Sequence, residues 1–319
     1  MNSLIKYGAL TLLFSVGAAH AQQWPSQPIK LVVPFPAGGG TDLIGRAIAK
    51  GLSEALGQPV VVDNRGGAGG RIGSDIDARA APDGYTLGVA TSSTHPTAVV
   101  LIKDVPYDPV KSFAPVTMIG KTAYVLLASP SLPAKNMSEF VAYAKANPGK
   151  LNFASVGVST LGYLVTRQMM VETGIDLVHV PYKGSAQVYP ALIGGEVAIE
   201  FDNPSASAAM VKSGRLNVLA TTLKTPLMPS APVFAELGYK NLDTNFWYGL
   251  VAPAGTPKAI VDRVQEAVAK FVQSPEGSGV LATAGVEPVG NKPEQFGAII
   301  ASDMARARAL ADKLDIKPE

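Results

Sequence analysis

Short apolar runs alternate with segments of helical periodicity in the first part of the chain. The run Ile29–Phe35 is apolar on both faces, which is typical of a buried parallel strand. The next segment, 41–56, repeats its apolar side chains every 3.6 residues and ends at a glycine, as an amphipathic helix does. We expect further strands at 59–63 and 85–90, with a helix that ends near Ala80 between them. This order of strand, loop and helix is typical of a doubly wound parallel sheet.

The same order of elements starts again in the second part of the chain. The strands expected there are 124–128, 151–154, 177–180, 197–201, 218–221 and 247–252. The helices expected there are 137–146, about 160–172, 186–193, 257–272 and 293–314. The pattern predicts two α/β units of similar architecture, and one large sheet is the alternative.

The breaks between the two units fall near Pro115–Lys121 and near Asn245–Gly249. We therefore expect residues 22–121 together with 247–319 to form lobe 1, and the inserted residues 122–246 to form lobe 2. Two linking segments are typical of a hinged protein that closes around a ligand. The predicted fold is a hinged, two-lobed α/β protein with a doubly wound, mainly parallel sheet in each lobe.

The first 21 residues have the features of a secretory signal peptide. Lys6 provides a positive charge, Gly8–Ala18 is almost entirely apolar, and Ala19-His20-Ala21 resembles a cleavage site. The apolar run is shorter than the roughly 20 residues of a membrane-spanning helix, which disfavours the alternative of an anchor. We expect cleavage after Ala21 and an exported, periplasmic protein.

Composition limits the chemistry of this chain. Its 319 residues include no cysteine and three histidines, which excludes thiolate nucleophiles, disulfides and cysteine-ligated metals. The 27 basic and 25 acidic residues nearly cancel, whereas a nucleic-acid binder needs clustered positive charge. We expect no nucleic-acid partner, no metal and no cofactor, since an exported protein has little access to nucleotide cofactors.

The first candidate site is the glycine-rich loop Pro36–Asp42 between the first strand and its helix. Unpaired N–H groups at a helix N-terminus attract anions, and glycines let an anion approach the backbone. The loop lacks the lysine of a P-loop and the spacing of a dinucleotide-binding loop, so a small carboxylate fits it better than a polyphosphate. A plain turn, with Thr41 or Asp42 capping the helix, is the alternative.

The second candidate is the loop Ala154–Thr160, at the corresponding junction of the second unit. Two helix N-termini that face each other across a cleft would hold an anion between the lobes. Ser159 as a hydrolase nucleophile is disfavoured, because Gly157–Leu161 does not complete the G-x-S-x-G elbow and no histidine base has a local signature.

Three further polar residues follow predicted strands. Ser92 and His95 come after the third strand, at the sheet edge where open α/β folds bind ligands, although an ordinary turn is the alternative. Asp202 would meet a ligand amine or hydroxyl, or else cap a helix. Trp247, at the second break, lines the cleft or packs the hinge, and His179 is interpreted as a hydrogen-bonded structural histidine.

Several motifs resemble one known family. They are Pro28-Ile-Lys-Leu-Val-Val-Pro-Phe-Pro-Ala-Gly-Gly-Gly-Thr-Asp42, Val62-Asp-Asn-Arg-Gly-Gly-Ala-Gly-Gly70, Pro82-Asp-Gly-Tyr-Thr86, Val180-Pro-Tyr-Lys-Gly184, Phe201-Asp-Asn203 and Trp247-Tyr-Gly-Leu-Val-Ala-Pro-Ala-Gly-Thr-Pro257. In this order they are similar to the Bug family, the extracytoplasmic solute receptors of tripartite tricarboxylate transporters. The resemblance covers essentially the whole chain after the signal peptide. It implies a two-lobed binding protein of the Venus-flytrap kind, with a carboxylate held in the cleft by Phe35–Asp42 and Ser155–Thr160.

The second loop departs from the Ser-Ser-Gly-x-Gly-Ser pattern and the following histidine that are usual in this family. Val156, Val158 and Tyr163 make the expected pocket less polar, which favours a ligand with an apolar or aromatic portion. The expected ligand-binding residues are Phe35, Ala37, Gly38, Gly39, Thr41, Asp42, Ser92, His95, Ser155, Gly157, Val158, Ser159, Thr160 and Asp202. The predicted function is that of a monomeric, non-enzymatic receptor that delivers a small-molecule carboxylate to membrane transporter subunits, with a membrane sensor as the alternative partner.

Overall fold

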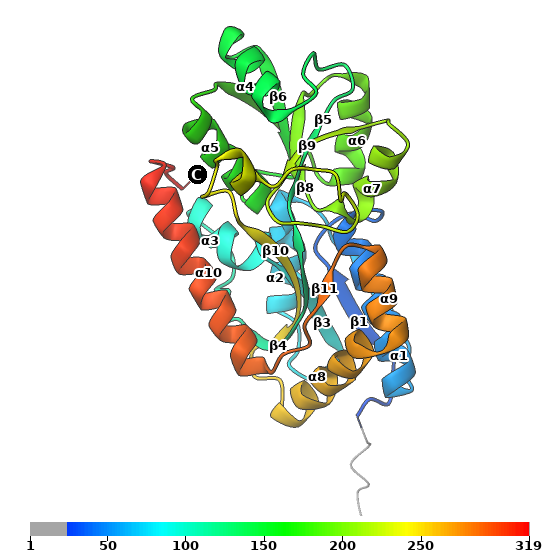
Figure 1. Cartoon of the computed structure of the whole chain (residues 1–319). Coiled ribbons are helices and arrows are strands. Elements are labelled where there is room, and N and C mark those ends of the chain that lie inside the picture. Colours follow the sequence, from blue (N-terminus) through cyan, green and yellow to red (C-terminus); the bar gives the residue numbers. More distant parts are fainter. Residues whose placement is uncertain (1–23, 319) are drawn as a thin grey trace, which may run out of the picture.

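The computed structural model describes residues 24–318 and consists of two α/β lobes stacked on each other (Figure 1). The predicted signal peptide, residues 1–21, lies outside the described residues. The longest helix, α10 (Pro293–Lys313), runs along one side of the molecule and ends beside the second lobe (Figure 1).

Lobe 1 contains a six-stranded sheet with the strand order β11-β4-β10-β3-β1-β2. Its strands are β1 (Ile29–Val33), β2 (Val60–Asn64), β3 (Thr86–Thr91), β4 (Phe113–Ala123), β10 (Asn245–Pro253) and β11 (Glu287–Pro288). Its other elements, apart from α10, are α1 (Gly40–Leu56), η1 (Ala68–Gly70), α2 (Arg71–Ala78), the π-helical turn η2 (Ser93–Thr97), α3 (Ala98–Leu101), α8 (Lys258–Gln273) and α9 (Pro275–Thr283).

Lobe 2 contains a five-stranded sheet with the strand order β7-β6-β8-β5-β9. Its strands are β5 (Val125–Ala128), β6 (Leu151–Ser155), β7 (Leu177–Pro181), β8 (Ile199–Asp202) and β9 (Asn217–Thr221). Its helices are α4 (Met137–Ala146), α5 (Leu161–Thr173), α6 (Ser185–Gly194), α7 (Pro204–Lys212) and η3 (Phe234–Leu237). The chain passes from one sheet to the other between Ala123 and Val125 and returns between Thr221 and Asn245.

Both sheets are mixed, which corrects the expectation of mainly parallel sheets. In lobe 1, β1 pairs in parallel with β2 and β3, but β10 is antiparallel to both of its neighbours. In lobe 2, β6 pairs in parallel with β7 and β8, but β5 is antiparallel to both of its neighbours. The reason is that the chain enters lobe 2 through β5 and returns to lobe 1 through β10. Both strands therefore start near the cleft and run away from it, whereas the parallel strands run toward the cleft and end there.

Five of the described α-helices and β-strands were not expected from the sequence: α3, β4, α7, α9 and β11. Strand β4 includes the predicted break 115–121, where Pro115 and Gly120 lie. Pro115 is placed next to a register shift opposite Val251, and proline is tolerated at such irregularities. Helices α7 and α9 are nine residues each and rich in alanine, serine or glycine, so they show little amphipathic periodicity.

Aromatic side chains fill the region where the linking segments cross. Tyr124, between β4 and β5, has one aromatic ring on either side, with ring centroids 5.4 Å from Phe246 and 6.3 Å from Phe201. Trp247 on β10 is fully buried, packs edge-on against Phe296, and donates from Nε1 to Asp303 Oδ2 at 2.7 Å. Trp247 therefore packs the hinge region against α10.

His95 gives lobe 1 a predictable dependence of stability on pH. Its buried ring lies 4.6 Å from that of Phe113, and burial lowers its pKa to about 3. In the unfolded chain its pKa returns to about 6.5, so its contribution to stability is complete above pH 6.5 and is lost as the pH falls toward 3. When the pH falls from 7 to 5, the unmodified protein should lose about 2 kcal/mol of unfolding free energy through His95, and the variant His95→Phe should not show this loss. Urea denaturation at both pH values measures this difference, and equal losses would contradict the burial of a neutral His95.

Candidate functional site

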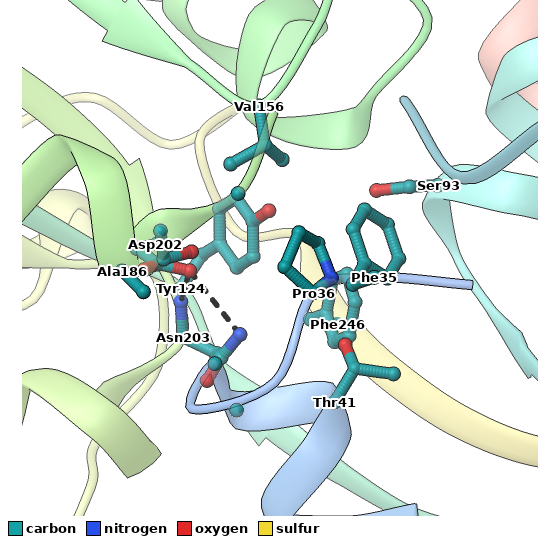
Figure 2. A pocket seen from close by; sticks show the side chains of 14 residues that line it. Phe35, Pro36, Thr41, Ser93, Tyr124, Val156, Ala186, Asp202, Asn203 and Phe246 are labelled. Carbon is teal, nitrogen blue, oxygen red and sulfur yellow. Dashed lines mark hydrogen bonds between the residues drawn. The ribbon is translucent and has the colours of Figure 1, made fainter. Parts of the chain in front are cut away.

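A cavity between the two lobes is the candidate functional site (Figure 2). Lobe 1 contributes the β1–α1 loop and Ser93, lobe 2 contributes the loops before α5, α6 and α7, and the linking segments contribute two aromatic rings. The lining residues are Phe35, Pro36, Gly39, Gly40, Thr41, Ser93, Tyr124, Val156, Gly184, Ser185, Ala186, Asp202, Asn203 and Phe246.

Three helices begin at this cavity. The N-cap residues of α1, α6 and α7 are Gly39, Gly184 and Asn203. The two glycines have no side chain to cap their helices, and the Asn203 side chain makes no capping hydrogen bond. The first turns therefore present unpaired N–H groups and the positive ends of three helix dipoles toward one space. Such an arrangement binds an anion without any basic side chain.

Much of the remaining wall of the cavity is apolar. In Figure 2 the rings of Phe35, Tyr124 and Phe246 and the side chains of Pro36 and Val156 surround the space next to the helix starts. A molecule with an anionic end and an apolar body matches both parts of this surface.

Asp202 brings a buried carboxyl group to the same cavity. Its Oδ2 accepts a hydrogen bond from the Tyr189 hydroxyl at 2.8 Å, and its Oδ1 accepts from the Asn203 backbone N–H at 2.8 Å. Burial raises the pKa of Asp202, and burial together with the charge of Asp202 raises the pKa of Glu200 two residues earlier. A carboxyl group here holds the start of α7 in place and offers a polar contact to a ligand hydroxyl or amine.

The lobes touch through glycines. A Cβ atom at Gly40 would overlap with Asn203 Oδ1, and one at Gly69 would overlap with Ser159 Oγ. A Cβ atom at Gly184 would lie 2.9 Å from Pro36 Cδ. This close contact leaves a cavity of about 30 Å³ between the lobes.

Four of the expected site residues line this cavity: Phe35, Gly39, Thr41 and Asp202. Ala37 and Gly38 lie on the exposed side of the same loop. The Asp42 carboxylate accepts hydrogen bonds from Gly38 N, Arg46 Nε and Asn64 Nδ2 at 2.9–3.0 Å, so it fixes the shape of the loop. Burial tends to raise the pKa of Asp42, but these hydrogen bonds lower it below its ordinary value.

The expected residues of the second loop lie elsewhere on the seam between the lobes. The Ser155 hydroxyl bonds to His179 Nε2 at 2.7 Å, and Thr160 Oγ1 donates to Gly157 O. Ser159 Oγ donates to Ala68 O in lobe 1 at 3.2 Å. Gly157, Val158 and Ser159 line a separate space of about 440 Å³, together with Ala68, Gly69, Arg71, Pro181, Tyr182, Lys183 and Gln187.

Ser92 and His95 face other parts of the structure. Ser92 Oγ accepts a hydrogen bond from Trp247 N at 2.8 Å, and His95 lies among aromatic rings inside lobe 1. The N-terminus of α5 is also occupied, because Leu161 N donates to Ser93 Oγ at 3.1 Å.

The N-termini of α6 and α7 were not predicted from the sequence as candidate anion sites. The local signals were present, since glycine and asparagine are common N-cap residues and Pro204 occupies the first turn of α7. The convergence of these helices with α1 depends on how the two lobes are placed.

Residues 24–318 contain no group of three or more histidine, aspartate or glutamate side chains that is arranged to hold a metal ion. In this same part of the chain, none of the helices combines the length and apolar character needed to cross a membrane.

Known proteins resemble this chain over most of its length. Residues 44–316 match the family described as "Tripartite tricarboxylate transporter family receptor". Protein BugT of Bordetella pertussis is 37% identical over 290 residues, which cover 90% of this chain and 89% of that protein. A second protein of Bordetella pertussis is 33% identical over 318 residues, which cover 99% of this chain and 98% of that protein.

Several solved structures resemble this chain in both sequence and fold. The periplasmic binding protein BugD is 31% identical, with a TM-score of 0.89 over 93% of this chain and 100% of that chain. Rpa4515 of R. palustris, solved with adipate, is 34% identical, with a TM-score of 0.90 and the same coverage. MatC of Rhodopseudomonas palustris, solved with malate, is 29% identical, with a TM-score of 0.86 over 90% of this chain and 99% of that chain. The two-lobed α/β fold and the family resemblance expected from the motifs are confirmed.

Removing the carboxylate that holds the β1–α1 loop should destabilise the protein. Asp42→Ala removes an acceptor that the Gly38 N–H, the Asn64 amide and the Arg46 guanidinium share, so we expect a loss of about 1–3 kcal/mol of unfolding free energy. The exposed Asp104, for which no hydrogen bond or ion pair is found, provides the control variant Asp104→Ala. Urea denaturation at pH 7 compares the two, and equal stabilities would contradict this role of Asp42.

Proposed function

This chain belongs to the tripartite tricarboxylate transporter family of receptors, and we propose that it is a periplasmic receptor for an organic carboxylate with an apolar portion. The observation that carries the proposal is the convergence of three uncapped helix N-termini on a cavity whose other walls are mostly aromatic and apolar. Adipate and malate, present in the structures of two similar proteins, are both carboxylates, which supports the same ligand class.

The carboxylate is received by backbone N–H groups from both lobes. Helix α1 belongs to lobe 1, whereas α6 and α7 belong to lobe 2, so a ligand that contacts all three stabilises the closed arrangement relative to an open one. The rings of Phe35, Tyr124 and Phe246 contact the apolar portion. Because the enclosed cavity is only about 30 Å³, the lobes or the lining side chains must move to admit a ligand.

The receptor is exported by a signal peptide cleaved after Ala21 and binds its ligand as a monomer without chemical conversion. It then presents the ligand to membrane transporter subunits, as family membership suggests. Of the ligand-binding residues expected from the sequence, Phe35, Gly39, Thr41 and Asp202 retain this role in the proposal, because they line the cavity. A membrane sensor is the alternative partner, since the same cleft would serve it.

Calorimetric titration of the mature protein, residues 22–319, tests the ligand class. The panel consists of adipate, phenylacetate, malate and citrate, with hexane-1,6-diamine as the cationic counterpart of adipate. We expect saturable binding of adipate or phenylacetate, with at least about tenfold weaker binding of citrate, because the aromatic wall cannot pair a third carboxylate. Binding of the diamine, or tight binding of citrate alone, would contradict the proposal.

An acid placed at the start of α6 should block the anion site without harming the fold. Ala186 lines the cavity within the first turn of α6, where a negative side chain favours the helix dipole. We expect Ala186→Asp to weaken binding of the best carboxylate by at least about 30-fold, since repulsion between like charges and competition for the N–H groups act together. Ala259→Asp, on the exposed first turn of α8, is the matched control and should bind normally. Equal affinities of the two variants would exclude α6 from the site.

Closure of the lobes can be tested at Gly40. A methyl group there favours helix α1 by up to about 1 kcal/mol, but it overlaps with Asn203 and Ser205 when the lobes are closed. We expect Gly40→Ala to keep or raise the melting temperature and to weaken carboxylate binding by about tenfold. Gly279→Ala in α9, where a Cβ has no neighbour within 4 Å, should bind normally. Unchanged binding by Gly40→Ala would contradict the need for this contact.

A further inference from the structure

A second cavity, of about 330 Å³, lies at the hinge. It shares no lining residue with the cleft cavity, although the two cavities lie back to back. Ser92 and Asn245 line the hinge cavity, whereas the next residues, Ser93 and Phe246, line the cleft cavity. Since successive side chains of a strand point to opposite faces, β10 separates the two spaces. Cavities of this size bind small organic molecules in other proteins.

The inner wall of the hinge cavity is apolar and comes from both lobes. Leu161, Leu164 and Val165 project from α5 of lobe 2, and Ala307 and Leu310 project from α10 of lobe 1. Figure 1 shows α10 running beside α3 and toward α5 at this side of the molecule. Contact with an apolar molecule would therefore remove apolar surface of both lobes from water.

The charged groups at the edge of the hinge cavity cancel. Arg306 pairs with Asp303, whose other oxygen accepts the Trp247 Nε1 hydrogen bond. The remaining two charges, those of Lys313 and Asp243, are of opposite sign. An ion of either sign therefore gains little here over water, whereas an uncharged molecule keeps the full benefit of the apolar wall.

The polar groups of this cavity also hold the returning linking segment. Gln168 Nε2 donates to Asn241 O at 2.8 Å, and Ser92 Oγ accepts from Trp247 N at 2.8 Å. The Ser92 hydroxyl and the Gln168 side-chain oxygen retain hydrogen-bonding capacity toward an occupant. We propose that the hinge cavity is a second small-molecule site, which binds a compact, uncharged and mainly apolar molecule with one hydrogen-bonding group.

The indole N–H of Trp247 reports directly on this site, because it donates to Asp303 on the cavity wall. The chain has two tryptophans, so Trp24→Phe assigns the Trp247 signal in a ¹H–¹⁵N spectrum of the mature protein. Three probes of equal size are titrated: benzyl alcohol, benzoate and benzylamine. We expect benzyl alcohol to shift the Trp247 signal along a saturating curve. The dissociation constant from this curve should be at least tenfold lower than that of either charged probe, measured at the same signal.

Variants decide where the probe binds. Ala307→Phe fills the cavity from α10. Ala307→Leu adds a smaller side chain at the same place and serves if the larger ring impairs folding. Ala305→Phe, on the exposed side of α10, is the matched control. We expect both Ala307 variants to reduce the benzyl alcohol shift at least fivefold, with Ala305→Phe and Ala186→Asp unchanged. The proposal is overturned by a shift that does not saturate, by binding that survives both Ala307 variants, by loss of binding in Ala186→Asp, or by a charged probe that binds as well.

Discussion

The two lobes meet backbone to side chain at three glycines, and the ligand site exists because of this close approach. At Gly40 the α1 backbone touches Asn203, at Gly69 the lobe 1 loop touches Ser159, and at Gly184 the lobe 2 loop touches Pro36. A side chain at any of these positions would either displace the facing side chain or separate the lobes, and with the lobes the starts of α1, α6 and α7. The anion-binding potential of each helix alone is modest, since the dipole effect is confined to the first turn. Its concentration in one cavity is a property of the closed arrangement.

A chain with few charged residues can form such a site because the charge comes from the peptide backbone. The helix N-termini supply positive potential that cannot be titrated, whereas lysine and arginine would bring long side chains and a solvation cost into a small space. The carboxyl group of Asp202 is the one acidic side chain among the residues that line this cavity, and the hydrogen bonds from Tyr189 and Asn203 offset part of the cost of its burial. Polarity in this cavity therefore depends mostly on main-chain geometry, which explains why glycine and small residues line its most crowded parts.

Sequence patterns predicted what is local and missed what depends on distant partners. Helix α4 begins and ends where the periodicity places it, because Asn136 caps it by accepting from Glu139 N. The β1–α1 loop was identified as a candidate site from its glycines and its place before a helix N-terminus, and it lines the cavity. The hydroxyl of Ser155 was also a reasonable candidate, but it is bonded to His179 on the neighbouring strand. The roles of α6 and α7 follow from the packing of one lobe on the other, and no local pattern encodes that distance.

The glycine contacts also give the receptor a way to measure length. Because one side of each contact is glycine backbone, and the facing side chains of Asn203 and Ser159 are buried, the closed gap varies little in width. A ligand slightly too long would still reach the helix starts of one lobe, but it would hold Gly40 away from Asn203 and Gly69 away from Ser159. Ligand selection then has two steps. Initial binding depends on the charge of the molecule, and full closure of the lobes depends on its length. A membrane partner that recognises only the closed conformation would not accept a receptor whose bound molecule prevents full closure.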